Sequence, residues 1–469
     1  MFVKVIASLG PASGDVEVIE RMARNGVDAF RINFAHGGPE QWLKFVEGVR
    51  KVEECVGRPL ALIGDLKGPS VRVGVLEEPV VVSRGATLRM VLAPSSKGGE
   101  EAVVPVPEEH FFEVVDVGDV IVMDDGRVRL RVTEKPSRDE LEVTALTDAR
   151  ITSHKAVVVR GKDYGLPAIS REDSRNIDFA LKNGFDYISL SYVRRGEDLL
   201  LLKEILEKRG RGDVGVIAKV ETKSAVENLS EIIDAADVVM VARGDLGMNF
   251  SLEDIHHYQR LIVGKCLRRG KPVIVATQLL ESMIENPVPT RAEVVDISTA
   301  VEQGVDALML TGETSVGKHP VEAVMWLRKV IDRTEARMGR QLDTIAEAAR
   351  RRELNIFVRF DKGVVELAED LGAKLVVFSK LGMTPKAMAS LRPKVPLYVG
   401  ACDDRLLRKL TILWGLHPIK VEAADYDEGL EKTFEIVRNK NQINIGDVAV
   451  LTYGLRGAKQ VIEITKVTV

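Results

Sequence analysis

Short apolar runs alternate with amphipathic segments along the first two thirds of the chain. The amphipathic segments EVIERMARNG and EDIHHYQRLIVGKCLRRG place their apolar residues at helical spacing. The runs between such segments are apolar throughout, as strands of a parallel sheet are: KVIASLG, PLALIGDLKG, VGVIAKVE, DVVMVARGDLG and PVIVATQ. The pattern predicts about eight strand–helix units, the number that closes a (β/α)8 barrel.

An internal echo supports the barrel. NGVDAFRINF, NGFDYISLSY and QGVDALMLTG begin at Asn25, Asn183 and Gln303, and each has a Gly, then an Asp, then an apolar run. The Gly suits the left-handed position just past a helix C-terminus. The run that follows suits a strand buried on both faces, so each copy predicts a helix-to-strand connection.

The barrel pattern is interrupted once and then replaced. Between residues 70 and 166 the runs are short and alternating, as in VRVGVL and DVIVMDDGRVRLRV, with turn signals between them, which predicts a small inserted β-barrel domain. From residue 345 helices alternate with KLVVFSK, VPLYVGAC, PIKVEA and DVAVLTYG, which predicts an open α/β domain. We therefore predict a barrel over residues 1–69 and 167–340, an inserted domain over 70–166 and a C-terminal domain over 345–469.

Composition narrows the class of protein. A chain of 469 residues, 45% hydrophobic and 29% charged, predicts a soluble protein with two or three domains. The net charge of -4 comes from balanced signs without a basic block, which argues against a nucleic-acid partner. No apolar run is long enough for a membrane span and no signal-peptide pattern is present, so we expect a cytoplasmic location. Cys55, Cys266 and Cys402 fit no metal-ligand spacing, and we expect reduced core thiols.

Polar side chains gather where the predicted barrel strands end. Lys219 and Glu221 close one apolar run and share a strand face, because strand side chains alternate with period two. Taken alone, this pair fits a structural ion pair equally well. Other strands also end in polar residues, which favours a site at this rim: Arg31, Asn33, His36, Asp65, Lys67, Arg243, Gly244, Asp245, Thr277 and Gln278. Carboxylates beside Lys and Arg suit Mg²⁺ and a phosphorylated substrate.

Long motifs in a fixed order resemble the pyruvate kinase family over nearly the whole chain. They are ASLGPAS, RINFAHG, GDLKGP, AKVE, VMVARGDLG, ATQLLESM, PVPTRAEVVD and LMLTGETSVGKHPVEAV. The resemblance implies a prokaryotic member with a (β/α)8 barrel, a mobile β lid inserted after the third strand and a C-terminal α/β domain. It also implies a phosphotransferase of glycolysis, which moves the phosphoryl group of phosphoenolpyruvate to ADP and gives pyruvate and ATP.

The resemblance assigns the residues around the migrating phosphoryl group. Glu221 and Asp245 would hold Mg²⁺ or Mn²⁺. Lys219 would stabilise the charge on the phosphoryl group in flight, and Arg31, aided by Arg72, would bind it. Such a set fits phosphoryl transfer, which depends mostly on positioning and charge neutralisation.

The resemblance also places the substrate's remaining groups. The backbone at Gly244 and Asp245 would seat the substrate carboxylate, and Thr277 would lie near the carbon that is protonated. Ser191 would lie behind the phosphoryl group. No side chain is an obvious proton donor, so we expect a water chain near Thr277 to deliver the proton.

On the nucleotide side the matching positions are Pro11, Asn33 and His36, together with Asp124 and Asp125 in the inserted domain. Without the resemblance, His36 fits a turn and the paired acids fit a hairpin. The family's lid motif Lys-Gly-Val-Asn-x-Pro-Gly appears here as KAVVVRG, which keeps its first residue, Lys155, and loses the Asn and the Pro. Lys155 is therefore a candidate nucleotide ligand in an altered setting.

The K⁺ site of the family is altered in this chain. Members that use K⁺ bind it with an Asn, a Ser, an Asp and a backbone carbonyl. Asn33, Asp65 and the carbonyl of Leu66 remain, but Ala35 replaces the Ser. Ser70 stands where K⁺-dependent members carry Glu and independent ones often carry Lys. We predict weak or absent K⁺ dependence.

The segment VVFSKLGMTPKAMASLRP resembles the family's effector loop, with Ser379, Lys380 and Thr384 at the matching positions. The resemblance implies a phosphorylated sugar or nucleotide effector, and a turn before a helix is a suitable anion site. A plain helix start with Ser, Thr and Pro explains the same residues.

The segment PTRAEVVD predicts a helix start of its own. Thr290 and Glu293 form a T-x-x-E capping box. In the family this helix lies at a subunit contact, so the resemblance implies an interfacial Arg291 and a homotetramer.

Two other functions stay open on the sequence. A carbon–carbon lyase acting on phosphoenolpyruvate or pyruvate would share the metal and carboxylate seat, but would have no use for a lid and a nucleotide side. An inactive sensor would bind a sugar phosphate through the C-terminal loop. The complete set Lys219, Glu221, Asp245, Arg31 and Thr277 argues against a sensor.

Overall fold

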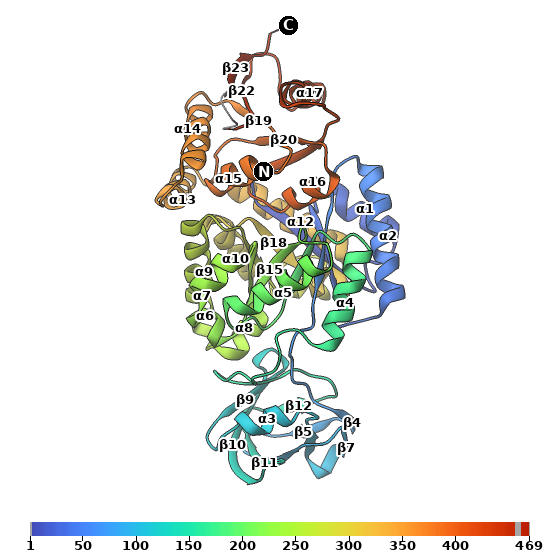
Figure 1. Cartoon of the computed structure of the whole chain (residues 1–469). Coiled ribbons are helices and arrows are strands. Elements are labelled where there is room, and N and C mark those ends of the chain that lie inside the picture. The colour runs from blue at the N-terminus through green and yellow to red at the C-terminus, as the bar shows by residue number, and fades with distance from the viewer. Residues whose placement is uncertain (1, 455–460, 469) are drawn as a thin grey trace.

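The computed structural model describes residues 2–454 and 461–468, and its centre is a closed barrel of parallel strands (Figure 1). Around the barrel the order is β1-β18-β17-β16-β15-β14-β3-β2. The strands are β1 Lys4–Leu9, β2 Ala29–Asn33, β3 Ala61–Asp65, β14 Tyr187–Leu190, β15 Gly215–Val220, β16 Val238–Ala242, β17 Val273–Ala276 and β18 Ala307–Leu310. The predicted (β/α)8 barrel is confirmed.

Helices cover the outside of the barrel. They are α1 Val16–Arg24, α2 Pro39–Val56, α4 Arg171–Lys182, α5 Gly196–Lys208, α6 Lys223–Glu227, α7 Leu229–Ala235, α8 Arg243–Asn249, α9 Ile255–Arg269, α10 Arg291–Glu302, α11 Gly312–Ser315 and α12 Pro320–Glu335. The start of α10 is the predicted capping box, in which Thr290 and Glu293 bond reciprocally.

The repeated Gly–x–Asp pattern has one structural cause. Gly26, Gly184 and Gly304 have φ of 102°, 71° and 80°, the left-handed conformation expected after a helix. The aspartates that follow, Asp28, Asp186 and Asp306, each accept a hydrogen bond from the backbone N–H of a neighbouring strand, at 2.8–2.9 Å. Each copy thus stops a helix and ties the next strand to its neighbour.

The inserted domain, called the lid below, lies at the end of the barrel where the strands finish (Figure 1). It has a six-stranded sheet in the order β13-β9-β10-β11-β6-β8 and the two-stranded sheets β12-β5 and β4-β7. The elements are β4 Val75–Glu78, β5 Val80–Val82, β6 Thr87–Val91, β7 Ser95–Gly98, β8 Val103–Pro105, α3 Glu109–Val114, β9 Val120–Met123, β10 Val128–Ser137, β11 Glu140–Ala145, β12 Ala149–Ile151 and β13 Val157–Val159. The sheets enclose a hydrophobic core of their own.

The C-terminal domain packs on the opposite end of the barrel (Figure 1). Its sheet has the order β21-β20-β19-β22-β23, parallel except for β23. The elements are α13 Arg340–Arg350, α14 Ile356–Asp370, β19 Lys374–Phe378, α15 Met383–Ser390, β20 Leu397–Ala401, α16 Asp404–Leu410, β21 Leu416–Lys420, α17 Tyr426–Asn439, β22 Val448–Thr452 and β23 Ile462–Lys466. The open α/β domain is confirmed; the antiparallel strand β23 was not predicted, because most of its side chains are exposed and it forms no apolar run.

Two further observations bear on the sequence predictions. Cys266 is buried, but Cys55 is exposed at the end of α2, so the prediction of a core thiol is wrong for Cys55. None of the described helices combines the length and the apolar character that crossing a membrane requires. The predicted domain boundaries stay a prediction.

Candidate active site at the lid end of the barrel

The C-terminal end of β15 places a cation and an anion together. Lys219 Nζ lies 3.4 Å from Glu221 Oε2 and 3.8 Å from Asp65 Oδ2, and it donates to Ser191 Oγ at 2.8 Å. The four residues come from β15, from β3 and from the end of β14. Residues predicted from three separate motifs thus meet in one cluster.

Arg31 joins the cluster from β2. Its Nε and Nη2 donate to Asp65 Oδ2 at 2.8 and 2.5 Å, and its Nη1 donates to Ser8 Oγ at 3.1 Å. Asp65 therefore lies between the two cations Arg31 and Lys219 and holds both in place. Its buried carboxylate sets the position of groups that the resemblance assigns to the phosphoryl group.

Tyr192 links the two predicted metal ligands and was missed by the sequence analysis. Its backbone N–H donates to Glu221 Oε1 at 2.6 Å, and its hydroxyl donates to Asp245 Oδ1 at 3.4 Å. Its φ of 54° is left-handed, a conformation costly for a residue with a side chain. Asn249 adds a hydrogen bond from Nδ2 to the carbonyl of Glu221 at 2.8 Å. Neither contact leaves a periodic signal in the sequence.

The cluster shifts the pKa values of its members. Burial raises the pKa of the Glu221 carboxyl, and Asp245 adds to the rise against the opposing charge of Lys219. Burial also opposes the charges of Lys219 and Asp65, but the attraction outweighs it, so the pKa of Lys219 lies above and that of Asp65 below its usual value. The site therefore keeps Lys219 charged, whereas Glu221 needs a further cation to ionise readily.

The carboxylates fit a divalent cation. Within the described residues, Glu221 Oε2 is buried and accepts no hydrogen bond, so a lone pair is free for a ligand. The described residues contain no group of three or more His, Cys, Asp or Glu side chains placed to hold a metal. Two carboxylates, Glu221 and Asp245, suit Mg²⁺ or Mn²⁺, because Mg²⁺ keeps several waters and binds substrate phosphate as well.

The turn after β17 is strained and held by Arg243. Thr277 and Gln278 have φ of 70° and 51°, an unusual conformation for a β-branched residue such as Thr. Arg243 donates to the carbonyl of Thr277 from Nε and Nη2 at 3.1 and 2.7 Å, and to that of Gln278 at 2.9 Å. Its Nη1 binds Asp296 Oδ2 at 2.6 Å. Arg243 and Asp296 therefore fix the position of Thr277.

Thr277 also meets the backbone predicted to seat the substrate carboxylate. Its Oγ1 accepts a hydrogen bond from the backbone N–H of Gly244 at 2.8 Å and donates to the carbonyl of Ala276 at 2.6 Å. In this structure the N–H of Gly244 thus points at Thr277 Oγ1. A substrate carboxylate would have to share or replace that bond.

A positive region lies around the predicted nucleotide residues. Partial burial lowers the pKa of His36, and the charges of Arg72, Arg31 and Lys67 lower it further. Arg72 donates to the carbonyl of His154 at 2.9 Å, at the hinge to the lid. Neutral His36 among cations suits a polyphosphate. Pro11, in the turn after β1, is exposed, and Asn33 ends β2.

The lid residues pair with each other. Lys155 Nζ binds Asp124 Oδ1 at 2.6 Å, and within the described residues neither side chain forms a hydrogen bond or ion pair with the barrel cluster. The side chain of Asp125 lies outside the described structure. The lid instead touches α8 through Val122, Val158 and Met248.

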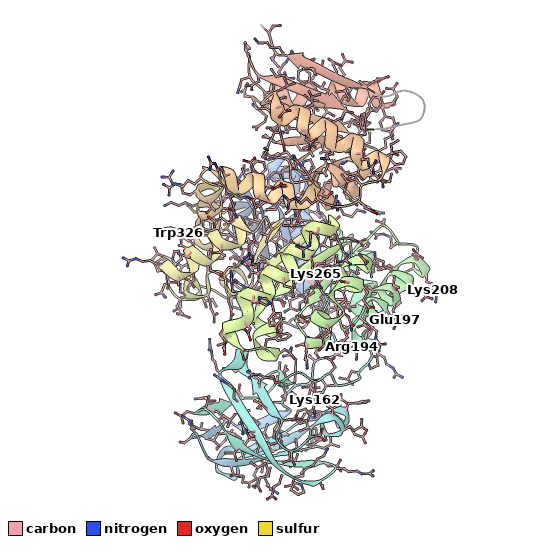
Figure 2. All side chains as sticks on the ribbon, turned by 90° about the vertical axis from the view of Figure 1, so that its left-hand side faces the viewer. Lys162, Arg194, Glu197, Lys208, Lys265 and Trp326 are labelled. Atoms are coloured by element: carbon pink, nitrogen blue, oxygen red, sulfur yellow. The ribbon has the colours of Figure 1, made fainter. Side chains whose placement is uncertain are left out.

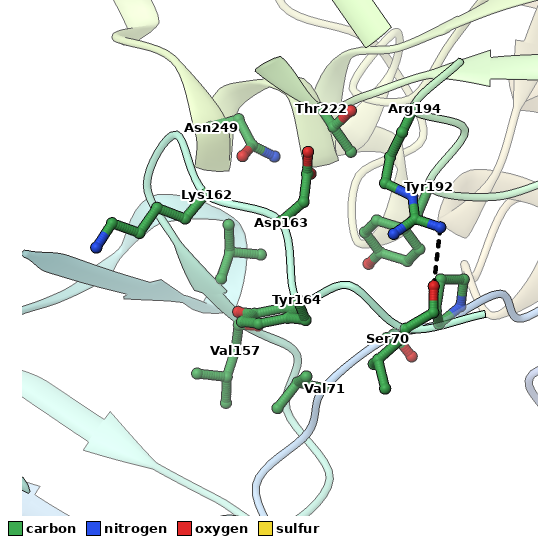
Figure 3. A pocket seen from close by; sticks show the side chains of 13 residues that line it. Ser70, Val71, Val157, Lys162, Asp163, Tyr164, Tyr192, Arg194, Thr222 and Asn249 are labelled. Atoms are coloured by element: carbon green, nitrogen blue, oxygen red, sulfur yellow. Dashed lines mark hydrogen bonds between the residues drawn. The ribbon is translucent and has the colours of Figure 1, made fainter. Parts of the chain in front are cut away.

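The lid and the barrel are in contact at their junction and leave only a small cavity there (Figure 3). Asp163 of the lid accepts a hydrogen bond from Ser224, and Arg194 donates to the carbonyl of Leu166 at 2.8 Å. Figure 2 shows Lys162 and Arg194 on the two sides of this junction. The cavity beside Tyr192 measures only about 30 Å³, which suits ordered water rather than substrate.

Three of the oxygens named for K⁺ already have partners, whereas Asp65 Oδ1 is buried and accepts no hydrogen bond from the described residues. Asn33 Oδ1 accepts from the N–H of Ala35 at 3.1 Å, and the carbonyl of Leu66 accepts from Ser191 Oγ at 2.7 Å. Asp65 Oδ2 is bound by Arg31.

The predicted effector residues lie far from this cluster, in the C-terminal domain. Ser379 Oγ accepts from the N–H of Gly382 at 2.9 Å. Lys380 Nζ donates to the carbonyl of Ala424 at 2.7 Å and lies over the ring of Tyr426. Thr384 is buried in the first turn of α15. Arg291 is exposed at the start of α10.

Comparisons with known proteins identify relatives over nearly the whole chain. The barrel-domain model of pyruvate kinase matches residues 2–324, and the model of its alpha/beta domain matches residues 362–468. The chain is 39% identical to a pyruvate kinase of Aeropyrum pernix, over 96% of this chain and 95% of that one. It is 40% identical to one of Pyrobaculum aerophilum, over 97% and 94%.

Solved structures lead to the same family. The crystal structure of pyruvate kinase from Pyrobaculum aerophilum superposes with a TM-score of 0.87 at 39% identity, covering 99% of both chains. One from Cryptosporidium parvum gives a TM-score of 0.91 at 28% identity, covering 99% of this chain and 96% of that one. The chain therefore belongs to the pyruvate kinase family.

Proposed function

We propose that the chain transfers the phosphoryl group of phosphoenolpyruvate to ADP, giving pyruvate and ATP. The observation that carries the proposal is the convergence of Lys219, Glu221 and Asp65 from separate strands, with Arg31 and Tyr192 completing the cluster. A migrating phosphoryl group is negatively charged, and pre-positioned cations lower the barrier to its transfer.

Lys219 and Arg31 hold the phosphoryl group. Asp65 and Ser191 fix the directions of the two cations, so little reorganisation is needed when the P–O bond to the enol oxygen breaks and a terminal oxygen of ADP takes the phosphorus. Glu221 and Asp245 would hold a divalent cation, which would supply further positive charge beside the phosphoryl group. Arg72 aids Arg31 in binding the phosphoryl group. Pro11, Asn33 and His36 face the nucleotide, and Lys155 approaches it from the lid.

The enolate left after transfer takes a proton on its terminal carbon. In this proposal Thr277 lies near that carbon, which is supported by the bonds from Arg243 to the carbonyls of the strained turn. A water chain beside Thr277 delivers the proton. The N–H of Gly244, released from Thr277 Oγ1, binds the substrate carboxylate together with the backbone of Asp245.

The remaining features of the proposal rest on the family resemblance. They comprise Mg²⁺ or Mn²⁺ as cofactor, a cytoplasmic homotetramer with Arg291 at a contact, and the domain boundaries 1–69 with 167–340, 70–166 and 345–469. A phosphorylated effector binds at Ser379, Lys380 and Thr384. K⁺ dependence is weak, which is supported by Ala35 at the family's Ser position and by the partners that Asn33 Oδ1 and the Leu66 carbonyl already have.

A single assay separates the proposed function from its alternatives. Pyruvate formation from phosphoenolpyruvate is followed with and without ADP, and with and without Mg²⁺. We expect turnover only when both are present, with one ATP formed for each pyruvate. Loss of phosphoenolpyruvate without ADP would indicate a lyase, and binding without turnover would indicate a sensor.

A further inference from the structure

A second cavity lies at the opposite end of the barrel, between the barrel and the C-terminal domain. Its volume is about 370 Å³. One wall is formed where β14, β15, β16, β17 and β18 begin, and the other by α15 and α16, which lie against this end of the barrel in Figure 1. We call it the interdomain cavity. It is more than ten times larger than the cavity of about 30 Å³ beside Tyr192.

The carboxylates of the interdomain cavity are all neutralised by cations. Asp306 forms a buried ion pair with Arg392. Two more acids pair with cations at 2.8 and 2.9 Å: Asp213 with Arg211 and Asp237 with Lys203. Each of these acids therefore already has a cation beside it.

Three lysines of the cavity have no such partner. Lys386 on α15 makes no ion pair and no side-chain hydrogen bond within the described part of the chain. Lys409 on α16 donates only to the carbonyl of Asp213, at 2.6 Å. Lys271, before β17, donates to the carbonyls of Asp234 and Ala236. The cavity therefore holds an excess of positive charge contributed by both domains.

Burial and the neighbouring positive charge lower the pKa values of two lysines in the cavity. Burial lowers the pKa of Lys386, the charge of Lys409 lowers it further, and Asp237 opposes the shift. Burial likewise lowers the pKa of Lys271. Lys386 lines the cavity, and its side chain is exposed to solvent. An anion in the cavity would relieve this repulsion.

We propose that the interdomain cavity binds a small phosphate monoester, with Lys271, Lys386 and Lys409 around its phosphate. The volume is within the range of small-ligand sites and exceeds what a bare phosphate fills, so the ester's organic part occupies the rest. Three ammonium groups match the two negative charges of a phosphate monoester better than they match the single charge of a carboxylate ligand. The ligand would join α15 and α16 to the barrel. The proposal does not rest on the catalytic function.

This site is separate from the predicted effector loop, although one helix serves both. Ser379, Lys380 and Thr384 lie before and in the first turn of α15, whereas Lys386 faces the barrel from the same helix. Lys380 Nζ points to the carbonyl of Ala424 instead. Substitutions at Lys380 and Lys386 therefore distinguish the two sites.

Lysine labelling tests the proposal directly on the full-length chain. Pyridoxal 5′-phosphate carries a phosphate and an aldehyde, forms an imine with a neutral lysine amine, and borohydride fixes the product for peptide mapping. We expect labelling at Lys386 or Lys271 above that at the exposed Lys208 on α5. Pyridoxal without the phosphate should label these lysines several-fold less.

Competition identifies the ligand class. Ribose 5-phosphate should protect the cavity lysines at lower concentration than inorganic phosphate, and ribose should not protect them. Equal protection by ribose 5-phosphate and by inorganic phosphate would show that the cavity binds only the phosphate group, and would contradict the proposal of an ester ligand. No protection by any phosphate would overturn the whole proposal.

Variants locate the binding residues. Lys409→Gln should weaken protection at Lys386 about tenfold, the usual effect of one charge-assisted hydrogen bond. Lys386→Gln, which removes no hydrogen bond or ion pair among the described residues, should weaken protection at Lys271 similarly. Lys208→Gln and Lys380→Gln should leave protection unchanged. Loss of protection in Lys380→Gln alone would place the ligand at the effector loop and contradict the proposal.

Discussion

The two ends of one barrel hold their charges in opposite ways. At the lid end Lys219 lies within 4 Å of Asp65 and Glu221, and Arg31 binds Asp65 as well. At the other end Lys271, Lys386 and Lys409 share a cavity whose acids already pair with other cations. The strands β14 and β15 run from one end to the other.

The contrast shows what each end can tolerate. At the lid end every charge positions another, so removal of one leaves its neighbours buried and unpaired, which is costly. At the far end Lys386 and Lys409 repel one another, so removal of either one relieves this repulsion. Substitutions should therefore have large effects on turnover at the lid end and small ones at the far end.

The largest effect is expected for Lys219→Met. It removes the cation that lies 3.4 Å from Glu221 Oε2 and 3.8 Å from Asp65 Oδ2, and should lower kcat about a thousandfold, as loss of a transition-state donor does. The control is Lys223→Met, whose ammonium lies exposed on α6 and pairs only with Glu227. Steady-state assays of both variants measure the difference. Similar kcat values in the two variants would contradict the role of Lys219.

A smaller loss is expected for Arg243→Lys. Lysine cannot make the fork of bonds that holds the carbonyls of Thr277 and Gln278, so Thr277 should shift and kcat should fall about ten- to a hundredfold. Retention of Mn²⁺ binding would show that the metal ligands stay in place. Arg260→Lys, on the exposed face of α9, serves as the control. An unchanged kcat would show that the strained turn needs no such support.

Metal binding should release a proton. Burial raises the pKa of Glu221, so in the metal-free protein it keeps its proton at pH values where an ordinary carboxyl has lost it. Mg²⁺ requires the carboxylate, and its affinity should therefore rise with pH until the raised pKa is passed. Calorimetry in two buffers of different ionisation enthalpy measures the proton count.

The variant Glu221→Gln tests whether the released proton comes from the Glu221 carboxyl. Because a raised carboxyl pKa costs stability once the pH exceeds the group's unfolded pKa, the metal-free variant should unfold at a higher temperature than the parent protein at neutral pH. At acid pH, below both pKa values, the difference should vanish. A proton release that survives in Glu221→Gln would assign it to another group.

Replacing K⁺ should have a small effect. Since Asn33 Oδ1 and the Leu66 carbonyl already accept hydrogen bonds, activity with Na⁺ or a quaternary ammonium salt should stay within about threefold of that with K⁺. A drop of several tenfold would refute the prediction.

The smallest effect is expected at the far end. Without added phosphate esters, the kcat of Lys386→Gln should stay within about twofold of that of the parent protein. Substitutions of exposed residues that belong to no hydrogen-bond or ion-pair network are nearly neutral. A large loss would show that the two ends of the barrel are not independent.

The barrel and the charged rim could be predicted from the sequence for physical reasons. Strands buried on both faces leave continuous apolar runs, and each Gly–x–Asp copy marks the stop of a helix and the tie to the next strand. Lys219 and Glu221 lie two apart, so their shared face followed from strand periodicity. The assignment of Arg31 and Asp245 depended on the family resemblance.

The parts that were missed depend on contacts between distant residues. Tyr192 reaches Glu221 through its backbone N–H, which any residue type provides. Arg243 supports Thr277 through carbonyls across a turn. Strand β23 pairs with β22 and is mostly exposed. Its sequence therefore lacks the continuous apolar run from which the other strands were predicted. The interdomain cavity exists only because two domains meet, and Lys271, Lys386 and Lys409 are far apart in the chain.

Electron paramagnetic resonance of Mn²⁺ with phosphoenolpyruvate tests the central claim most directly, namely that charges from separate strands converge on one divalent cation. The parent protein and Lys219→Met should bind one Mn²⁺ per chain, whereas Glu221→Gln and Asp245→Asn should each weaken binding at least tenfold. Equal Mn²⁺ binding in all four proteins would contradict the account.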